Sequence, residues 1–234
     1  MKPTRWPVTG ARSGGRFFAD GQFYHTMTRT GLSARLSAHL AEPFVEIHPE
    51  DAAHLSIGPA DLVWLRSPEG QGILRARITD SVRRGDVFAP MHWTGETAPS
   101  ARIDALVAAV TDPVSGQPES KASVVSLARL NAAWYGFAIS AAGIRPDCDY
   151  WALARTEAGY RAELAGLDTV EDWESYARRL FNLPDAEIQI IEDPSRGMAR
   201  VALRAGERLL AALFIASEPV AVMRDYVATL PGTT

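Results

Sequence analysis

The sequence predicts a β-rich α+β protein built from two small domains. A length of 234 residues suits either one large domain or two small ones. Short runs of β-branched and aromatic residues recur along the chain and are separated by turn residues, whereas few segments carry apolar residues at helical spacing. The stretch "TDPVSGQPES" at 111–120 consists of turn-forming residues and precedes the end of the first domain, which we place near residue 128.

The first domain is expected to alternate short strands with short helices. The run "FVEIH" reads as a strand, and "PEDAAHLSIG" reads as a helix of one or two turns, with Pro49 at its first position and Gly58 just past its end. A hairpin turns at residues 68–70. In order, we expect a strand at 44–48, a helix at 49–58, a hairpin at 61–80, a strand at 85–93, a helix at 101–110 and a closing segment at 123–127.

The second half carries its own set of elements. The segment "TVEDWESYARRLF" at 169–181 predicts an amphipathic helix with Thr169 as its N-cap, because Trp173, Ala177, Leu180 and Phe181 fall on one face. A turn at residue 206 divides two further strands within 198–216. The remaining expected elements are strands at 132–140, 149–156, 160–167 and 186–193, and a closing helix at 219–230.

Composition excludes several classes of protein. The single cysteine, Cys148, excludes a disulfide framework, a cysteine-rich zinc site and an iron–sulfur cluster held within this chain, and we interpret it as structural. The net charge of −4 argues against general nucleic-acid binding. No apolar run has the length of a membrane span, and the first residues lack the apolar centre of a secretory signal, so we expect a cytoplasmic protein with no membrane partner.

The residues show no organised catalytic motif. The glycines lack the spacing of a P-loop or a Rossmann turn, and the five histidines include no HExxH pair. The carboxylates of Glu96, Asp104 and Asp112 lie in expected loops, and Ser33 and Ser115 lack a nucleophile-elbow pattern. Residues 25–37 interleave hydroxyls with arginines, which suits either contacts with an anion or an ordinary surface loop.

Three ordered stretches carry a resemblance to a known family. They are "HTMTRTGLSARLSAHLAEPFVEIHPEDA", "VFAPMHWTGETAPSARIDALV" and "TDPVSGQPESK". Together they resemble the C-terminal molybdopterin dinucleotide-binding domain of bacterial assimilatory nitrate reductases, in the superfamily that includes DMSO reductase. The resemblance runs from about Tyr24 to Val125. Later segments look like the extension that follows this domain in the same enzymes.

The resemblance implies a fold and a domain division. In this family the domain is a double-psi β-barrel that lies over the molybdenum cofactor. We therefore expect residues 1–23 to be a tail that is similar to the end of the preceding family domain. Residues 24–128 would form the molybdopterin dinucleotide-binding barrel, and residues 129–234 would form a small accessory α+β domain.

The resemblance also implies a cofactor and the residues that contact it. The cofactor is bis-molybdopterin guanine dinucleotide. His25 and Thr26 match the family's cofactor-contacting pair, and a second loop faces the cofactor at residues 92–94. No catalytic residue and no metal ligand is expected in this chain. The expected cofactor-binding residues are His25, Thr26, Thr28, Arg29, His92, Trp93, Thr94, Asp104, Gln117 and Lys121.

The sequence departs from the family pattern at its beginning. Relatives open this domain with an apolar strand that ends in Asn-Thr-Gly-Arg, whereas here "RWPVTGARSGGRFFADGQF" leads directly into "YHTMTRTG". We expect the first barrel strand to be missing, with Phe17, Phe18 and Phe23 as candidates for a substitute edge. The family's molybdenum ligand and iron–sulfur cysteines are expected on other domains.

Three functions remain open. The first is a portion of an assimilatory nitrate reductase that positions the cofactor while nitrate is reduced to nitrite, beside the catalytic or electron-donor portion of that enzyme, and is not catalytic by itself. The second is a docking module that interacts with another protein and has lost cofactor binding. The third is a stand-alone enzyme, which we rank last because no acid, base or nucleophile converges in the pattern.

Overall fold

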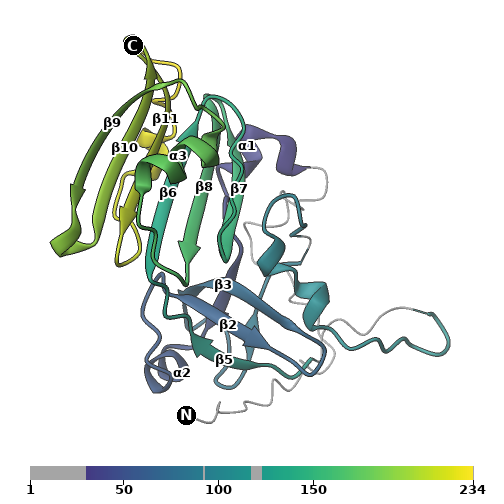
Figure 1. Ribbon diagram of the computed structural model, residues 1–234. Helices are drawn as coiled ribbons and strands as arrows, with labels where there is room; N and C mark the ends of the chain where they lie inside the picture. Colours follow the sequence, from purple (N-terminus) through teal and green to yellow (C-terminus); the bar gives the residue numbers. More distant parts are fainter. Residues whose placement is uncertain (1–29, 92, 117–122, 234) are drawn as a thin grey trace. The chain divides into compact units, whose positions relative to one another are not determined.

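The computed structural model describes residues 30–91, 93–116 and 123–233, and they form two compact units (Figure 1). Unit 1 contains Pro43–Asn131, and unit 2 contains residues 30–42 together with residues 132–233. Residues 1–29, which include the candidate edge at Phe17, Phe18 and Phe23, lie outside the described residues. Each unit is built around its own sheet, and the β-rich α+β fold class is confirmed.

Unit 1 is a five-stranded sheet that curls into half of a barrel. The strand order is β4-β1-β3-β2-β5. β1 runs parallel to β3, and the other neighbouring pairs are antiparallel. The strands are β1 (Phe44–Ile47), β2 (Leu62–Arg66), β3 (Gln71–Ile78), β4 (Val87–Phe88) and β5 (Ser126–Arg129).

The short helix after β1 forms as the sequence predicts. α2 (Pro49–His54) has proline at its first position, and the His48 Nδ1 atom accepts a hydrogen bond from the Glu50 N–H at 3.2 Å. The buried Asp51 carboxylate accepts a hydrogen bond from the Gly85 N–H at 2.7 Å. This bond ties the helix to the segment that leads into β4.

Two expectations for unit 1 were wrong, one in the length of a strand and one in the kind of helix. The strand expected at 85–93 is limited to the two residues of β4, because Pro90 has no N–H with which to continue the ladder beside β1. The helix expected at 101–110 is instead a pair of 3-10 turns, η2 (Pro99–Ala101) and η3 (Ile103–Leu106). Arg102 adopts an extended conformation (φ −75°, ψ 111°) between the turns and prevents one continuous helix.

Unit 2 is a six-stranded antiparallel sheet with the order β7-β8-β6-β11-β10-β9. The expected strands are all present, and the turn at Gly206 joins two of them in the left-handed conformation (φ 58°) that glycine favours. The strands are β6 (Trp134–Ser140), β7 (Tyr150–Thr156), β8 (Gly159–Gly166), β9 (Glu187–Asp193), β10 (Met198–Ala205) and β11 (Arg208–Ala216).

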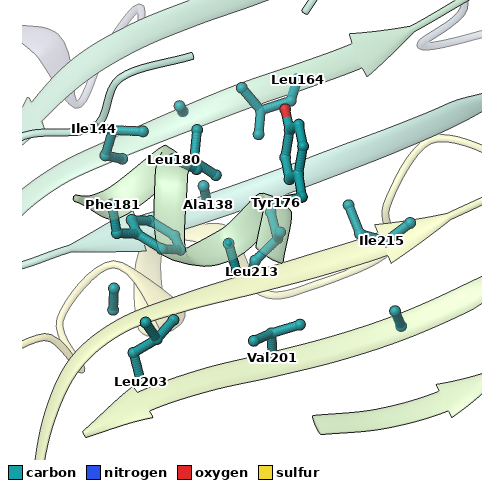
Figure 2. Packing of buried hydrophobic residues seen from close by; sticks show 14 of the residues in the cluster. Ala138, Ile144, Leu164, Tyr176, Leu180, Phe181, Val201, Leu203, Leu213 and Ile215 are labelled. Atoms are coloured by element: carbon teal, nitrogen blue, oxygen red, sulfur yellow. The ribbon is translucent and has the colours of Figure 1, made fainter. Parts of the chain in front are cut away.

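One helix covers a face of this sheet. α3 (Trp173–Phe181) buries Tyr176, Leu180 and Phe181 against apolar side chains of the strands, and Figure 2 shows this packing. The prediction of Thr169 as N-cap was wrong. The cap is Asp172, whose carboxylate accepts hydrogen bonds from the Ser175 N–H at 3.0 Å and the Ser175 hydroxyl at 2.5 Å.

The closing helix is shorter than the expected 219–230. α4 (Arg224–Val227) has a single turn, because Met223 directly ahead of it adopts a non-helical conformation (φ −75°, ψ 83°). Arg224 is the first residue of this helix. Its guanidinium forms an ion pair with the buried Glu163 of β8, with Nε and Oε1 2.5 Å apart. None of the helices among the described residues is long and apolar enough to span a membrane.

Candidate functional site

Three of the ten expected cofactor-binding residues belong to the described part of unit 1. They are Trp93, Thr94 and Asp104. The remaining seven lie outside the described residues, so the site can be built only from its second loop and its surroundings. The seven are His25, Thr26, Thr28, Arg29, His92, Gln117 and Lys121.

Trp93 and Thr94 begin the loop that follows β4. The Trp93 side chain is buried, with 4% of its surface exposed, and its indole Nε1 has no hydrogen-bond partner among the described residues. Thr94 starts a tight turn in which its carbonyl oxygen accepts hydrogen bonds from the N–H groups of Thr97 and Ala98, at 3.1 and 2.9 Å. The turn fixes an exposed threonine directly beside a buried tryptophan.

Asp104 lies in η3 and is already paired. The Arg102 guanidinium donates to both of its carboxylate oxygens, at 3.3 and 2.8 Å. These hydrogen bonds lower the pKa of Asp104 below its ordinary value, although desolvation opposes them. Because the charges of Asp104 and Arg102 balance, this pair adds no net charge to the loop.

The loop that contains η2 and η3 is held close to the hairpin of β2 and β3. A Cβ atom added to Gly70 would lie 2.4 Å from the carbonyl oxygen of Ala105, and one added to Gly72 would lie 3.2 Å from that of Ser100. Only glycine leaves room for backbone at the first of these distances. The hairpin therefore fixes the position of the loop through two glycines.

Three buried polar atoms of unit 1 have no hydrogen-bond partner among the described residues. They are Trp93 Nε1, Ser100 Oγ and Ser123 Oγ. Buried polar groups are nearly always paired, so each of these groups calls for a partner outside the described protein atoms. All three can donate to acceptor atoms such as phosphate or pterin oxygens, and this chemistry fits a dinucleotide cofactor.

Sequence reasoning did not single out Ser100 or Ser123. Ser100 lies within the second of the three family stretches, and Ser123 follows the third by two residues. A small hydroxyl inside a cofactor motif is the signal that could have indicated Ser100. No comparable signal marked Ser123.

The Asp112 carboxylate, in the third family stretch, has a structural role. Asp112 Oδ1 accepts hydrogen bonds from the N–H groups of Val114 and Ser115 and from the Ser115 hydroxyl, at 3.0, 2.7 and 2.9 Å. These bonds lower the pKa of Asp112. Asp112 and Ser115 therefore stabilise the turn that leads to residue 117.

Two buried carboxylates brace the sheet beneath these loops. Asp61 forms an ion pair with Arg129 of β5, with Oδ2 and Nε 2.8 Å apart, and accepts a hydrogen bond from the Gly58 N–H at 2.7 Å. Glu46 of β1 lies beside Arg77 of β3 at 3.8 Å. Burial raises the pKa of Glu46, and the charge of Arg77 partly offsets this effect.

Among the described residues, no group of three histidine, cysteine or acidic side chains is placed to bind a metal ion.

Within the hydroxyl-rich run, the described residues belong to unit 2. Ser33 caps α1 (Ala34–Ser37) by accepting from the Leu36 N–H, and the buried Ser37 hydroxyl donates to the Gly31 carbonyl at 3.2 Å. Farther along the same segment, the Tyr150 hydroxyl of β7 donates to Glu42 Oε1 at 2.6 Å. Residues 30–42 are therefore fixed to β7 immediately after the residues expected to contact the cofactor.

Cys148 of unit 2 has the environment of a structural thiol. Its sulfur donates a hydrogen bond to the carbonyl oxygen of Tyr150 at 3.2 Å. Burial raises the pKa of the thiol to about 11, so the reactive thiolate is scarce near neutral pH.

Unit 1 is thus a curled sheet whose loops carry buried donors without partners among the described residues, and this chemistry is compatible with a cofactor-binding domain. Residues 19–124 match the family model described as the molydopterin dinucleotide binding domain, and this part of the chain belongs to that family. The expected resemblance to the molybdopterin dinucleotide-binding region of nitrate reductases is confirmed.

Relatives fall among two kinds of enzyme. The chain is 37% identical over 207 residues to a nitrate reductase from Klebsiella oxytoca, covering 87% of this chain and 23% of that protein. It is 36% identical over 107 residues to the F420-dependent formate dehydrogenase subunit alpha from Methanocaldococcus jannaschii, covering 46% of this chain and 15% of that protein. It is 34% identical over 104 residues to the assimilatory nitrate reductase catalytic subunit from Bacillus subtilis, covering 44% and 14%.

The chain thus spans less than a quarter of the length of these relatives. Among solved structures it aligns with acetylene hydratase from Pelobacter acetylenicus over 53% of this chain and 18% of that one. The TM-score of 0.41 and the identity of 16% are too low for this alignment to add to the assignment.

Proposed function

We propose that this chain binds the bis-molybdopterin guanine dinucleotide form of the molybdenum cofactor, as part of an assimilatory nitrate reductase that converts nitrate to nitrite. The observation that carries the proposal is the set of three buried donors in unit 1 without partners, Trp93 Nε1, Ser100 Oγ and Ser123 Oγ. Two lie inside the family stretches and the third lies just after them. The relative with the longest match among those compared above is named a nitrate reductase.

The residues of this chain would bind and orient the cofactor. Hydroxyl, indole and backbone N–H groups suit uncharged and phosphate oxygens, and Arg29 would add a charge-assisted hydrogen bond. His25, Thr26 and Thr28 would belong to the same first loop, and His92 to the second. Gln117 and Lys121 would complete the set in the third stretch. The molybdenum cofactor, when bound, supplies the redox chemistry, and the protein supplies its position and electrostatic surroundings.

In this proposal residues 24–128 form the cofactor-binding barrel and residues 129–234 form an accessory domain. The catalytic or electron-donor portion of the enzyme lies on the remaining sequence that the longer relatives possess. The chain alone is therefore expected not to reduce nitrate. Nitrate reduction by the purified chain with a reduced viologen dye and no other subunit would contradict this expectation.

The binding proposal is tested by the shift in thermal unfolding caused by GDP, which reproduces the nucleotide end of the cofactor. A ligand that binds only the folded state raises the midpoint temperature, and the rise increases with the ratio of ligand concentration to Kd. His25→Ala and Arg29→Ala should reduce this shift. Arg84→Ala provides a matched control, because Arg84 is an exposed arginine of unit 1 that pairs with Glu50 at 2.9 Å. An equal GDP shift in all four proteins would contradict the assigned loop, and no shift would contradict nucleotide binding.

A further inference from the structure

The strand β9 is the last strand at one edge of the sheet of unit 2. Among the described residues it pairs only with β10, through seven successive residue pairs from Met198↔Asp193 to Arg204↔Glu187 (Figure 1). This ladder contains no bulge, so the strand is regular along its whole length. In such a strand, alternate backbone N–H and C=O groups point away from the sheet and are available to another strand.

The two edges of this sheet are treated differently. At the opposite edge, β7 lies against η1 (Thr30–Leu32) and α1, and its Tyr150 hydroxyl binds Glu42. No described element lies beyond β9 in the strand order. The contrast shows that one edge is covered from within the unit and that the other edge presents a template for pairing.

β9 lacks the lysine, the proline and the bulge by which proteins often protect an edge, and its charged residues are all acidic. Residues 187–193 contain no lysine, arginine or proline. Ile191 is 76% exposed and its neighbour Ile190 is 37% exposed, and successive strand residues point to opposite faces. An added strand would place side chains beside both isoleucines and would bury apolar surface on each face of the sheet.

The charge of the strand selects the kind of strand that it can accept. Glu187, Glu192 and Asp193 give β9 three acidic residues and no basic residue. Glu187 and Glu192 are exposed, whereas Asp193 caps the following 3-10 turn through the Arg196 N–H and the Ser195 hydroxyl. Pairing of two copies would bring three acidic residues of one strand beside three of the other, with no basic residue in either strand, and like charges on paired strands are destabilising. A second copy of this chain is therefore a poor occupant.

We propose that β9 is a docking edge for an extended basic segment of a separate protein, which joins unit 2 as a seventh strand. Backbone hydrogen bonds would supply the affinity. Basic side chains beside Glu187 and Glu192, and apolar ones beside Ile190 and Ile191, would supply the selectivity. The proposal depends on unit 2 alone and is independent of cofactor binding by unit 1.

The test uses the full chain and a fluorescent seven-residue peptide, followed by fluorescence anisotropy. The peptide has arginine at positions 2 and 7 and valine at positions 3 and 4, which in an antiparallel pair lie opposite Glu192, Glu187, Ile191 and Ile190. We expect saturable binding that weakens at least tenfold in the Glu187→Lys/Glu192→Lys double variant and in Ile191→Lys. Met223→Lys is the matched control, because Met223 is 77% exposed in the same unit, and it should bind as the parent does. A second peptide, N-methylated at alternate residues, cannot form the backbone ladder and should not bind.

Several results would overturn the proposal. These are the absence of saturable binding, equal binding of the methylated peptide, and equal binding by the strand variants. Self-association of the chain that Ile191→Lys abolishes would also overturn it, since it would assign the edge to a second copy. Circular dichroism of Ile191→Lys shows whether that variant keeps its structure. Ile191→Thr keeps strand propensity and should retain the fold, so weaker peptide binding by this variant reports loss of docking and not loss of structure.

Discussion

At the scale of single residues, the environment of a side chain decides between roles that the sequence leaves equivalent. Thr169 and Asp172 are both good helix caps and lie three residues apart. Trp173 packs edge-on against Trp134, with ring centroids 5.3 Å apart, and so fixes the first helical residue of α3. Asp172 is consequently the cap, although the sequence pattern favoured Thr169.

Asp172→Ala should lower the midpoint of thermal unfolding, whereas Thr169→Ala should leave it unchanged. The reason is that Asp172 accepts two hydrogen bonds from Ser175 at the helix start. These bonds lower the pKa of Asp172, so the stabilisation is present above the unfolded-state pKa and is lost as the pH falls through the folded-state value. Calorimetric scans of both variants check this prediction, and a larger effect of Thr169→Ala would refute it.

Glu46→Gln should make the protein more stable near pH 8, and this advantage should shrink as the pH falls. Burial raises the folded-state pKa of Glu46 above its unfolded value of 4.5, so the ionised form is penalised in the folded protein. The contribution of the parent carboxyl is therefore most favourable at low pH and is lost as the pH rises through its folded-state pKa. Urea unfolding between pH 5 and 8 measures the difference.

The exposed Glu69→Gln serves as the control for Glu46→Gln, because its side chain lies in the turn between β2 and β3. An advantage of Glu46→Gln that grows as the pH falls would show that the ion pair with Arg77, rather than burial, dominates at this site.

At the scale of elements, regular strands follow from sequence and loop positions do not. The strands of unit 2 were predictable because alternation of side chains has a period of two, and a buried face enforces it over the whole strand. The helix expected at 101–110 was not recovered, because the approach of Ala105 to Gly70 depends on residues that are distant in sequence. The burial of the Ser100 and Ser123 hydroxyls was not predicted from the sequence for the same reason.

Gly70→Ala should displace the loop that contains η2 and η3. The new methyl group would lie 2.4 Å from the carbonyl oxygen of Ala105, and such overpacking costs about 1–3 kcal/mol. Gly95→Ala is the matched control, because nothing lies within 4 Å of a Cβ added there. Chemical unfolding of both variants tests the difference, and equal stabilities would mean that the hairpin does not hold this loop.

At the scale of the whole molecule, the units are interleaved along the chain. Residues 30–42 belong to unit 2 although they precede all the strands of unit 1. The residues expected to contact the cofactor come directly before this segment. Along the chain, residues 30–42 of unit 2 therefore follow directly after the first residues proposed to bind the cofactor.

Tyr150→Phe should loosen residues 30–42 while the sheet of unit 2 persists. The variant loses a hydrogen bond of 2.6 Å to the Glu42 carboxylate, and such a bond is worth about 1.5–3 kcal/mol. The Ser37 and Ala38 N–H groups donate to the carbonyl oxygens of Ser33 and Ala34 at α1. Faster hydrogen exchange at these two amides would report the change. Tyr226→Phe, at a tyrosine that is 62% exposed, should have no such effect. Unchanged exchange in Tyr150→Phe would show that the segment is anchored by other contacts.

This chain is proposed to bind the nucleotide end of a molybdopterin guanine dinucleotide cofactor. Isothermal titration of the purified chain with GDP, and separately with CDP, tests it most directly. We expect saturable binding of one GDP per chain and weaker binding of CDP. No heat from GDP, in a chain that still unfolds cooperatively, would contradict the claim and would favour a docking module without cofactor.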